Sequence, residues 1–236
     1  MGDDMKIKLF IIHGWTYTIE PWTSVVSILR SKGIEVEQLR VPGLTAESGK
    51  VWDIDDYVQW LHQELKGESA PIVLGHSNGG RIALNYLKQY PGSISELILL
   101  NAAGINVSNR KVSLKRRLFK IAAFMFRPLK YIPLVRKIAY RVIGGSDYDR
   151  ASENMKKTLN NMLKSDRRLD ISDIKTPVQV LWGANDTTTP LAQGEKMARL
   201  LPNARLKVFN GWAHAPYITH PNEVAAAIIK ALGGRS

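Results

Sequence analysis

The chain contains no cysteine. This absence excludes disulfide bonds, thiolate metal sites and a cysteine nucleophile, and it suits a reducing compartment such as the cytoplasm. No apolar run approaches the roughly 18 residues of a membrane-spanning helix, and the run from Leu9 to Ile12 is too short for a signal peptide. We therefore expect a cytoplasmic protein that holds no metal ion and crosses no membrane.

Acidic residues are scarce in one part of the chain. Residues 105–170 hold 17 of the 33 lysines and arginines but only 5 of the 21 acidic residues, so this segment carries the whole net charge of +12. The rest of the 236 residues is electrically neutral. With 44% hydrophobic and 23% charged residues, the composition is that of a globular protein with one domain and an insertion, or with two small domains.

Short apolar runs alternate with amphipathic segments along most of the chain. We expect strands at residues 6–12, 34–39, 71–74, 96–100, 177–182 and 205–209. We expect helices at residues 20–32, 53–65, 80–90, 190–201 and 221–232. This alternation predicts βαβ units, and hence an α/β fold in which about six mostly parallel strands are flanked by helices on both faces.

Residues 105–170 interrupt the alternation. The segment has several helical patterns and no strand pattern, and it is broken at Pro128 and Pro133. We expect it to form a helical, basic cap inserted after the fourth strand, while residues 1–104 and 171–236 form the core of the fold.

Ser77 is the first candidate for chemistry. It lies in the sequence Gly75-His76-Ser77-Asn78-Gly79, between an expected strand and an expected helix. A serine hydroxyl is a weak nucleophile unless it is exposed and paired with a base. A sharp turn from strand to helix exposes the hydroxyl, and the glycines let neighbouring backbone approach closely. A plain turn is the alternative, but the position of the motif favours a nucleophile.

A base for Ser77 must come from the five histidines. His214 lies in a loop directly after the sixth expected strand, at the edge where a parallel sheet presents catalytic side chains. We expect His62 on the solvated side of a helix and His220 at a helix terminus. His214 is therefore the predicted base, and His220 is its rival.

The base in turn needs a carboxylate that fixes its tautomer. Asp186 lies just past the fifth expected strand, although a loop aspartate is often only a turn residue. Asp170 and Asp173 precede that strand and would lie at the opposite edge of the sheet. The chain order Ser77, Asp186, His214, with each residue after a different strand, is the order found in α/β-hydrolases.

The sequence resembles the α/β-hydrolase family over nearly its whole length, and in particular its small capped serine esterases and lactonases. The matching segments are His13-Gly14-Trp15, Gly75-His76-Ser77-Asn78-Gly79-Gly80, Gly183-x-x-Asp186-x-x-x-Pro190, and Gly211-x-x-His214 with Pro221 following. The resemblance implies that Ser77 is the nucleophile, Asp186 the acid and His214 the base.

The resemblance also implies an oxyanion hole made by the backbone N–H groups of Trp15 and Asn78. His13, Gly14 and His76 are expected to bind substrate. The chain lacks room for the two N-terminal strands of many larger relatives, and its oxyanion motif is His-Gly-Trp where others have a glycine-rich HGGG. The serine excludes the relatives with an aspartate nucleophile, the haloalkane dehalogenases and epoxide hydrolases.

The basic segment admits three interpretations. Its clustered cations Lys115, Arg116, Arg117 and Lys120 alternate with apolar residues. Such a helix would make weak contact with an anionic membrane, or attract an anionic substrate, or present a plain solvated face. Nucleic-acid binding is not expected, because no recognition motif accompanies the charge.

These observations predict a cofactor-independent serine hydrolase that cleaves carboxylic esters of small to medium acyl chains through an acyl-enzyme. Lactones, including acyl-homoserine lactones, are the alternative substrates, and C–C bond cleavage in a dienoic keto-acid is a third option. A catalytically silent binding module is the alternative from a different class. The physiological substrate, the ester or lactone preference and the oligomeric state are left open.

Overall fold

The computed structural model of the protein describes residues 7–105 and 152–233. Six strands in these ranges form a single parallel sheet in the order β2-β1-β3-β4-β5-β6. They are β1 (Lys8–Ile12), β2 (Glu35–Gln38), β3 (Ile72–His76), β4 (Glu96–Leu100), β5 (Val178–Gly183) and β6 (Ala204–Phe209). The prediction of an α/β fold with about six mostly parallel strands is confirmed.

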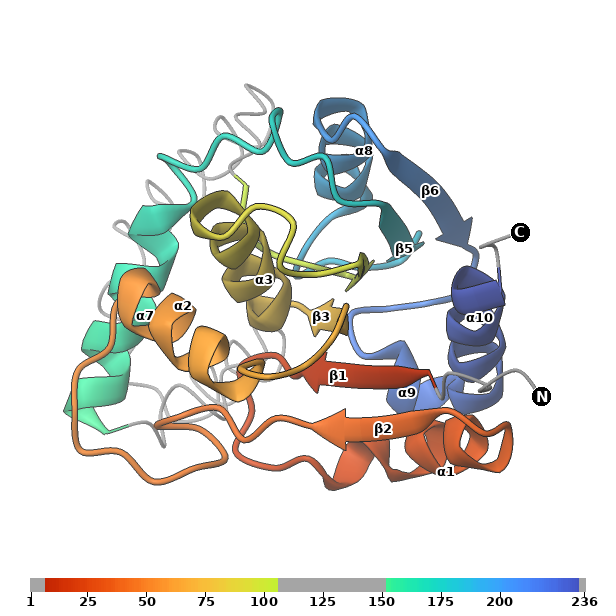
Figure 1. Cartoon of the computed structure of the whole chain (residues 1–236), viewed down its shortest axis with the longest axis horizontal. Coiled ribbons are helices and arrows are strands. Elements are labelled where there is room, and N and C mark those ends of the chain that lie inside the picture. The colour runs from red at the N-terminus through yellow and green to blue at the C-terminus, as the bar shows by residue number, and fades with distance from the viewer. Residues whose placement is uncertain (1–6, 106–151, 234–236) are drawn as a thin grey trace, which may run out of the picture.

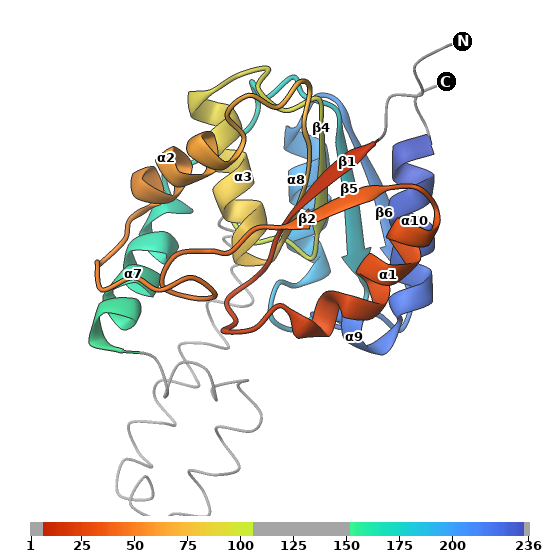
Figure 2. The ribbon, with the colours of Figure 1, turned by 60° about the horizontal axis from the view of Figure 1, so that its bottom comes forward.

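Helices cover both faces of the sheet (Figures 1 and 2). One face packs against α2 (Ile54–Glu64), α3 (Asn78–Gln89), α7 (Glu153–Ser165) and α8 (Leu191–Leu200). The other face packs against η1 (Glu20–Trp22), α1 (Thr23–Ser31), α9 (Pro216–Thr219) and α10 (Pro221–Gly233). A sheet covered on both sides needs apolar residues at every strand position, and all five positions of both β3 and β4 are buried.

The two apolar cores lie on opposite sides of the same strands. Along β1, Phe10 and Ile12 belong to the core under α2 and α3, whereas Leu9 and Ile11 belong to the core under α1 and α10. This division follows from the two-residue period of a strand. The central strands are therefore fixed from both faces, and the loops at their carboxyl ends start from rigid positions.

The expected elements differ from the observed ones mainly at their ends. The helix expected at 20–32 is divided into η1 and α1, with Pro21 in the first turn of η1. The short helix α9 was not expected, since its four residues are too few to show a periodic pattern. α2 begins at a capping box in which Asp53 and Asp56 each accept a hydrogen bond from the other's backbone N–H.

Of the expected cap, the structure describes residue 105 and residues 152–170. α7 lies in the second of these ranges and contacts α2, and the hydroxyl of Thr158 on α7 accepts a hydrogen bond from the backbone N–H of Trp52 at 2.9 Å. The basic cluster at Lys115 to Lys120 lies outside the described residues, and the limits of the cap stay a prediction. No helix in residues 7–105 and 152–233 is long and apolar enough to cross a membrane.

Candidate active site

Ser77 forms a sharp turn between β3 and α3. Its φ of 50° and ψ of −117° place a non-glycine residue in a rarely adopted conformation. The backbone around it is held by hydrogen bonds, since its N–H donates to the Leu100 carbonyl at 3.3 Å and its carbonyl accepts from Gly80 and Ala103. A strained backbone conformation of this kind persists only where the surrounding structure holds it in place. The side chain of Ser77 is left only half-buried.

The glycines around Ser77 are required by close approach of the backbone. A Cβ atom on Gly75 would lie 2.6 Å from the Cα atom of Gly80, and one on Gly79 would collide with the carbonyl oxygen of Ile12. The GxSxG pattern therefore follows from how tightly α3 packs against the ends of β1 and β3.

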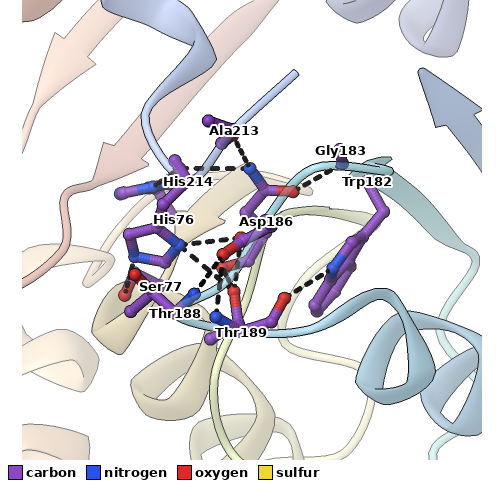
Figure 3. A network of polar contacts seen from close by, with 10 residues as sticks. His76, Ser77, Trp182, Gly183, Asp186, Thr188, Thr189, Ala213 and His214 are labelled. Atoms are coloured by element: carbon purple, nitrogen blue, oxygen red, sulfur yellow. Dashed lines mark hydrogen bonds and ion pairs between the residues drawn. The ribbon is translucent and has the colours of Figure 1, made fainter. Parts of the chain in front are cut away.

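Ser77, Asp186 and His214 lie together at the carboxyl edge of the sheet (Figure 3). The Ser77 Oγ atom is 2.9 Å from His214 Nε2, and His214 Nδ1 is 2.8 Å from Asp186 Oδ2. The carboxylate accepts the Nδ1 proton, so Nε2 of a neutral ring is free to accept the Ser77 hydroxyl proton. The three residues follow β3, β5 and β6, which are different strands of one sheet.

The Asp186 carboxylate is fully buried. Its side chain is 0% exposed, and Oδ1 accepts the backbone N–H groups of Thr188 and Thr189 at 2.8 and 2.9 Å. Burial raises the pKa of Asp186, but the hydrogen bonds from His214 and Thr189 outweigh burial and hold the pKa below its usual value. The carboxylate is therefore ionised and oriented toward His214. Sequence reasoning missed the two threonines, although an Asx turn at Asp186 was a possible signal.

The two residues expected to form an oxyanion hole lie on segments beside Ser77. Asn78 is the first residue of α3, where backbone N–H groups have no acceptor within the helix and the helix dipole favours negative charge. Trp15 follows Gly14, which is so close to the serine that a Cβ atom on Gly14 would lie 3.0 Å from Ser77 Cβ. Their role as oxyanion donors stays a prediction.

The two buried histidines near the site are 2% and 3% exposed. His13 Nδ1 donates to the Gly14 carbonyl at 2.7 Å, and the Thr45 hydroxyl lies 2.7 Å from Nε2. Burial lowers the pKa of His13, against the opposing effect of the Gly14 hydrogen bond. His76 lies in the interior below the His214 loop. Its burial does not favour the substrate-binding role expected for it, and that role stays a prediction for His13, Gly14 and His76 alike.

The rival residues make other contacts. His220 ends α9, and its Nδ1 lies 2.7 Å from the hydroxyl of Thr219. His62 is half-buried and stacks on the ring of Tyr90, with centroids 4.2 Å apart, so the expectation of a solvated His62 holds only in part. The reason is that Tyr90 follows α3 and covers this side of α2. Asp173 pairs with Lys88 at 2.6 Å.

Within residues 7–105 and 152–233, no group of three or more His, Cys, Asp or Glu side chains is placed to hold a metal ion. The site consists of the hydroxyl of Ser77, the imidazole of His214 and the carboxylate of Asp186, which are joined in this order by hydrogen bonds. Such a chain can activate the hydroxyl as a nucleophile and return a proton to a leaving group.

Comparison with known proteins identifies the family of this chain. The family model Hydrolase_4, described as serine aminopeptidase, S33, matches residues 3–219. A pimeloyl-[acyl-carrier protein] methyl ester esterase from Aromatoleum aromaticum is 25% identical, covering 93% of this chain and 96% of the relative. The human monoacylglycerol lipase ABHD6 is 26% identical, covering 95% and 74%.

A solved structure shows the same fold. It is MGS-MChE2, an α/β-hydrolase enzyme from the metagenome of sediments of the Mar Chica lagoon in Morocco. The two chains superpose with a TM-score of 0.70 at 24% identity, covering 97% of this chain and 91% of the other.

Proposed function

The chain belongs to the Hydrolase_4 family (serine aminopeptidase, S33) and is a serine hydrolase of the α/β-hydrolase fold, and from this premise we propose that it hydrolyses carboxylic esters of small to medium acyl chains. Ser77 is the nucleophile, His214 the base and Asp186 the residue that orients His214. The single observation that carries the proposal is the continuous hydrogen-bonded chain from Ser77 Oγ through His214 to Asp186 Oδ2.

Each step of the reaction uses a contact of this chain. Ser77 Oγ attacks the ester carbonyl carbon while His214 Nε2 takes the hydroxyl proton, and Asp186 stabilises the imidazolium that forms. The negative charge that develops on the carbonyl oxygen faces the backbone N–H groups of Trp15 and Asn78. The C–O bond to the alcohol then breaks, and the leaving alkoxide takes the proton from His214.

Water completes the cycle. His214 Nε2 takes a proton from the water as its oxygen attacks the acyl-enzyme carbonyl, and the proton then passes to Ser77 Oγ as the acyl–serine bond breaks. The products are the free carboxylic acid and the restored serine. Every proton is carried by His214, so the reaction as proposed uses no cofactor.

The names of the relatives support an ester as the substrate. The two curated relatives described above are named for the hydrolysis of a methyl ester and of a monoacylglycerol, both of which are carboxylic esters. Neither is named a lactonase, so the lactone alternative stays a prediction. Peptide hydrolysis enters as a second candidate, because the family is described as a serine aminopeptidase and amides are cleaved by the same three residues.

The test is a substrate panel. The wild-type chain and Ser77→Ala would be compared on p-nitrophenyl esters of rising acyl length, on γ-lactones and acyl-homoserine lactones, and on aminoacyl p-nitroanilides. We expect hydrolysis of the shorter esters by the wild type and a loss of at least about 10³-fold in Ser77→Ala. Full activity in Ser77→Ala would overturn the mechanism, and activity on lactones or anilides alone would overturn the ester assignment.

A further inference from the structure

The backbone carbonyl of His214 accepts hydrogen bonds from two buried side chains. His76 Nε2 lies 2.8 Å from this oxygen, and Asn101 Nδ2 lies 3.1 Å from it. The same Asn101 nitrogen lies 2.7 Å from the carbonyl oxygen of Ala213. The peptide that carries the imidazole is thus held by two donors from two other strand ends.

Asn101 connects the loops that carry the acid and the base. It follows β4, is 0% exposed, and has a φ of 44°, a conformation that asparagine tolerates better than most residues. Its Oδ1 atom accepts the Gly183 N–H at 2.8 Å, and its own carbonyl oxygen lies 3.0 Å from the Thr189 hydroxyl. That hydroxyl also lies 2.7 Å from Asp186 Oδ2. Figure 3 shows the network converging on Asp186 and His214.

His76 directly precedes the nucleophile Ser77 in the sequence, and its ring contacts the backbone of the base. Its ring packs edge-on against Trp22 and Tyr217, with centroids 6.0 and 5.0 Å away, and a Cβ atom on Gly14 would lie 2.9 Å from His76 Nδ1. Gly14 is therefore required because the loop that leads to Trp15 lies against this ring. One side chain touches the segments that carry the nucleophile, the base and an expected oxyanion donor.

The tautomer of His76 follows from its surroundings. Burial, and secondly the nearby His214, lower the pKa of His76 to about 3, so its ring is neutral. A carbonyl oxygen only accepts, so Nε2 must carry the proton that it donates to His214. Nδ1 is then an acceptor, and it is buried with no hydrogen-bond partner among residues 7–105 and 152–233. Within these ranges the ring makes a hydrogen bond to the His214 carbonyl through Nε2.

We propose that His76 and Asn101 are positioning residues that hold the backbone of His214, so that its imidazole spans the gap between Ser77 and Asp186. This inference rests on the proposed function for the role of His214. The imidazole must reach two partners at 2.8 and 2.9 Å, and a displacement of about 1 Å in such a site can cost roughly 100-fold in rate.

The matched pair His76→Leu and His76→Gln tests the contact. Leucine removes the donor and keeps an apolar volume, whereas the Gln amide can place an N–H group near the position of Nε2. We expect kcat on a p-nitrophenyl ester to fall about 10- to 100-fold in His76→Leu with little change in KM, and to recover in part in His76→Gln. Equal kcat values for His76→Leu and the wild type would overturn the proposal.

Asn101→Asp tests the second donor. Aspartate keeps an oxygen for the Gly183 N–H and tolerates the positive φ, but it turns an acceptor toward the carbonyl oxygens of Ala213 and His214. We expect a fall in kcat at least as large as that in His76→Leu. Asp173→Asn, at the opposite edge of the sheet, is the control and should keep wild-type kcat and KM.

A double variant distinguishes a positioning role of His76 from a general loss of structure. If His76 acts through His214, then adding His76→Leu to His214→Ala should cause no further loss of activity, although both variants carrying His76→Leu should melt at a lower temperature than their parents. An additional loss of activity equal to that in the wild-type background would contradict the proposal.

A readout without turnover distinguishes the two ways in which the account can fail. The His214 Nδ1–H proton bonded to Asp186 should give a low-field NMR signal that is absent from His214→Ala. We expect the signal to be lost or broadened in His76→Leu and retained in His76→Gln. If the wild type hydrolyses no ester but shows this pattern, the proposed function fails and the positioning stands. If it hydrolyses esters and His76→Leu keeps both signal and kcat, the positioning fails alone.

Discussion

The two ends of α3 carry ion pairs that contrast sharply. Near its start, Arg81 binds Asp166 through two contacts of 2.6 and 2.9 Å, with side chains 5% and 16% exposed, and also donates to the side chain of Asn78. Near its end, Lys88 binds Asp173 at 2.6 Å with side chains 37% and 64% exposed. The first end lies at the carboxyl edge of the sheet beside Ser77, and the second lies at the amino edge.

The carboxyl edge holds further buried polar side chains. At the carboxyl edge, the polar side chains of His76, Asn101, Asp186 and Thr189 are all 5% exposed or less, and each bonds to at least one other loop or strand end. Burying polar groups costs free energy unless they are hydrogen-bonded. The buried contacts at the carboxyl edge orient the side chains that serve chemistry, whereas the Lys88–Asp173 pair at the amino edge is exposed and should contribute little to stability.

The largest expected effect is at the base. His214→Ala should lower kcat on the best ester by about 10⁴- to 10⁶-fold, because the variant loses the imidazole that lies 2.9 Å from the Ser77 hydroxyl and takes its proton. His220→Ala is the matched control, since His220 bonds to Thr219 and lies outside the hydrogen-bonded chain. Steady-state kinetics on both variants checks this. Loss of activity in His220→Ala with retention in His214→Ala would place the base elsewhere.

The next effect is at the carboxylate. Asp186→Asn should lower kcat about 10⁴-fold, because an amide can no longer hold the Nδ1–H tautomer of His214. Asp170→Asn is the counterpart at the amino edge, where Asp170 bonds only to Ser172 in the described part of the chain. Equal effects of the two substitutions on kcat would contradict the claim that the catalytic residues lie at the carboxyl edge.

The two ion pairs of α3 should differ in stability. Arg81→Met leaves Asp166 unpaired at a mostly buried position and should lower the free energy of unfolding by about 3–5 kcal/mol. Lys88→Met removes an exposed pair and should lower it by less than about 1 kcal/mol. Urea unfolding of both variants measures the difference. Losses of similar size would contradict the claim that the buried pair at the carboxyl edge contributes more to stability than the exposed pair at the amino edge.

A smaller effect is expected on the free energy of unfolding in acidic solution. The pKa of His76 falls from 6.5 to about 3 in the folded state, so the unfolded chain binds more protons between these pH values. The contribution of His76 to the free energy of unfolding is therefore fully present above about pH 6.5 and is lost as the pH falls toward 3. His76→Gln lacks this contribution, and its free energy of unfolding should decline less steeply over that range, by a few kcal/mol in total. Equal slopes would mean that His76 is not buried as a neutral ring.

The strands, most helices and the identity of the three central residues follow from local signals. Apolar runs mark β3 and β4, and residues that follow strand ends must gather at one sheet edge, which brings Ser77, Asp186 and His214 together. The positioning contacts have no such signal. Asn101 and His214 are separated by 113 residues, and nothing in the periodicity of either segment says which buried amide meets which carbonyl.

The partial burial of His62 has the same origin. Its place on the polar side of α2 predicted an exposed ring, but the ring of Tyr90, which follows α3, stacks on it. The short helix α9 and the ion pair of Arg81 with Asp166 also depend on packing between distant segments. Sequence patterns specify which strand end a residue follows, whereas contacts among the loops depend on the packed structure.

The most direct test of the central claim is covalent labelling of the nucleophile. The protein would be incubated with a fluorophosphonate or quenched during turnover of a p-nitrophenyl ester, and the adduct located by mass spectrometry of peptides. We expect one adduct per chain on Ser77, and none in Ser77→Ala or, at matched times, in His214→Ala. An adduct on another residue, or ester hydrolysis that continues while Ser77 stays unmodified, would contradict the account.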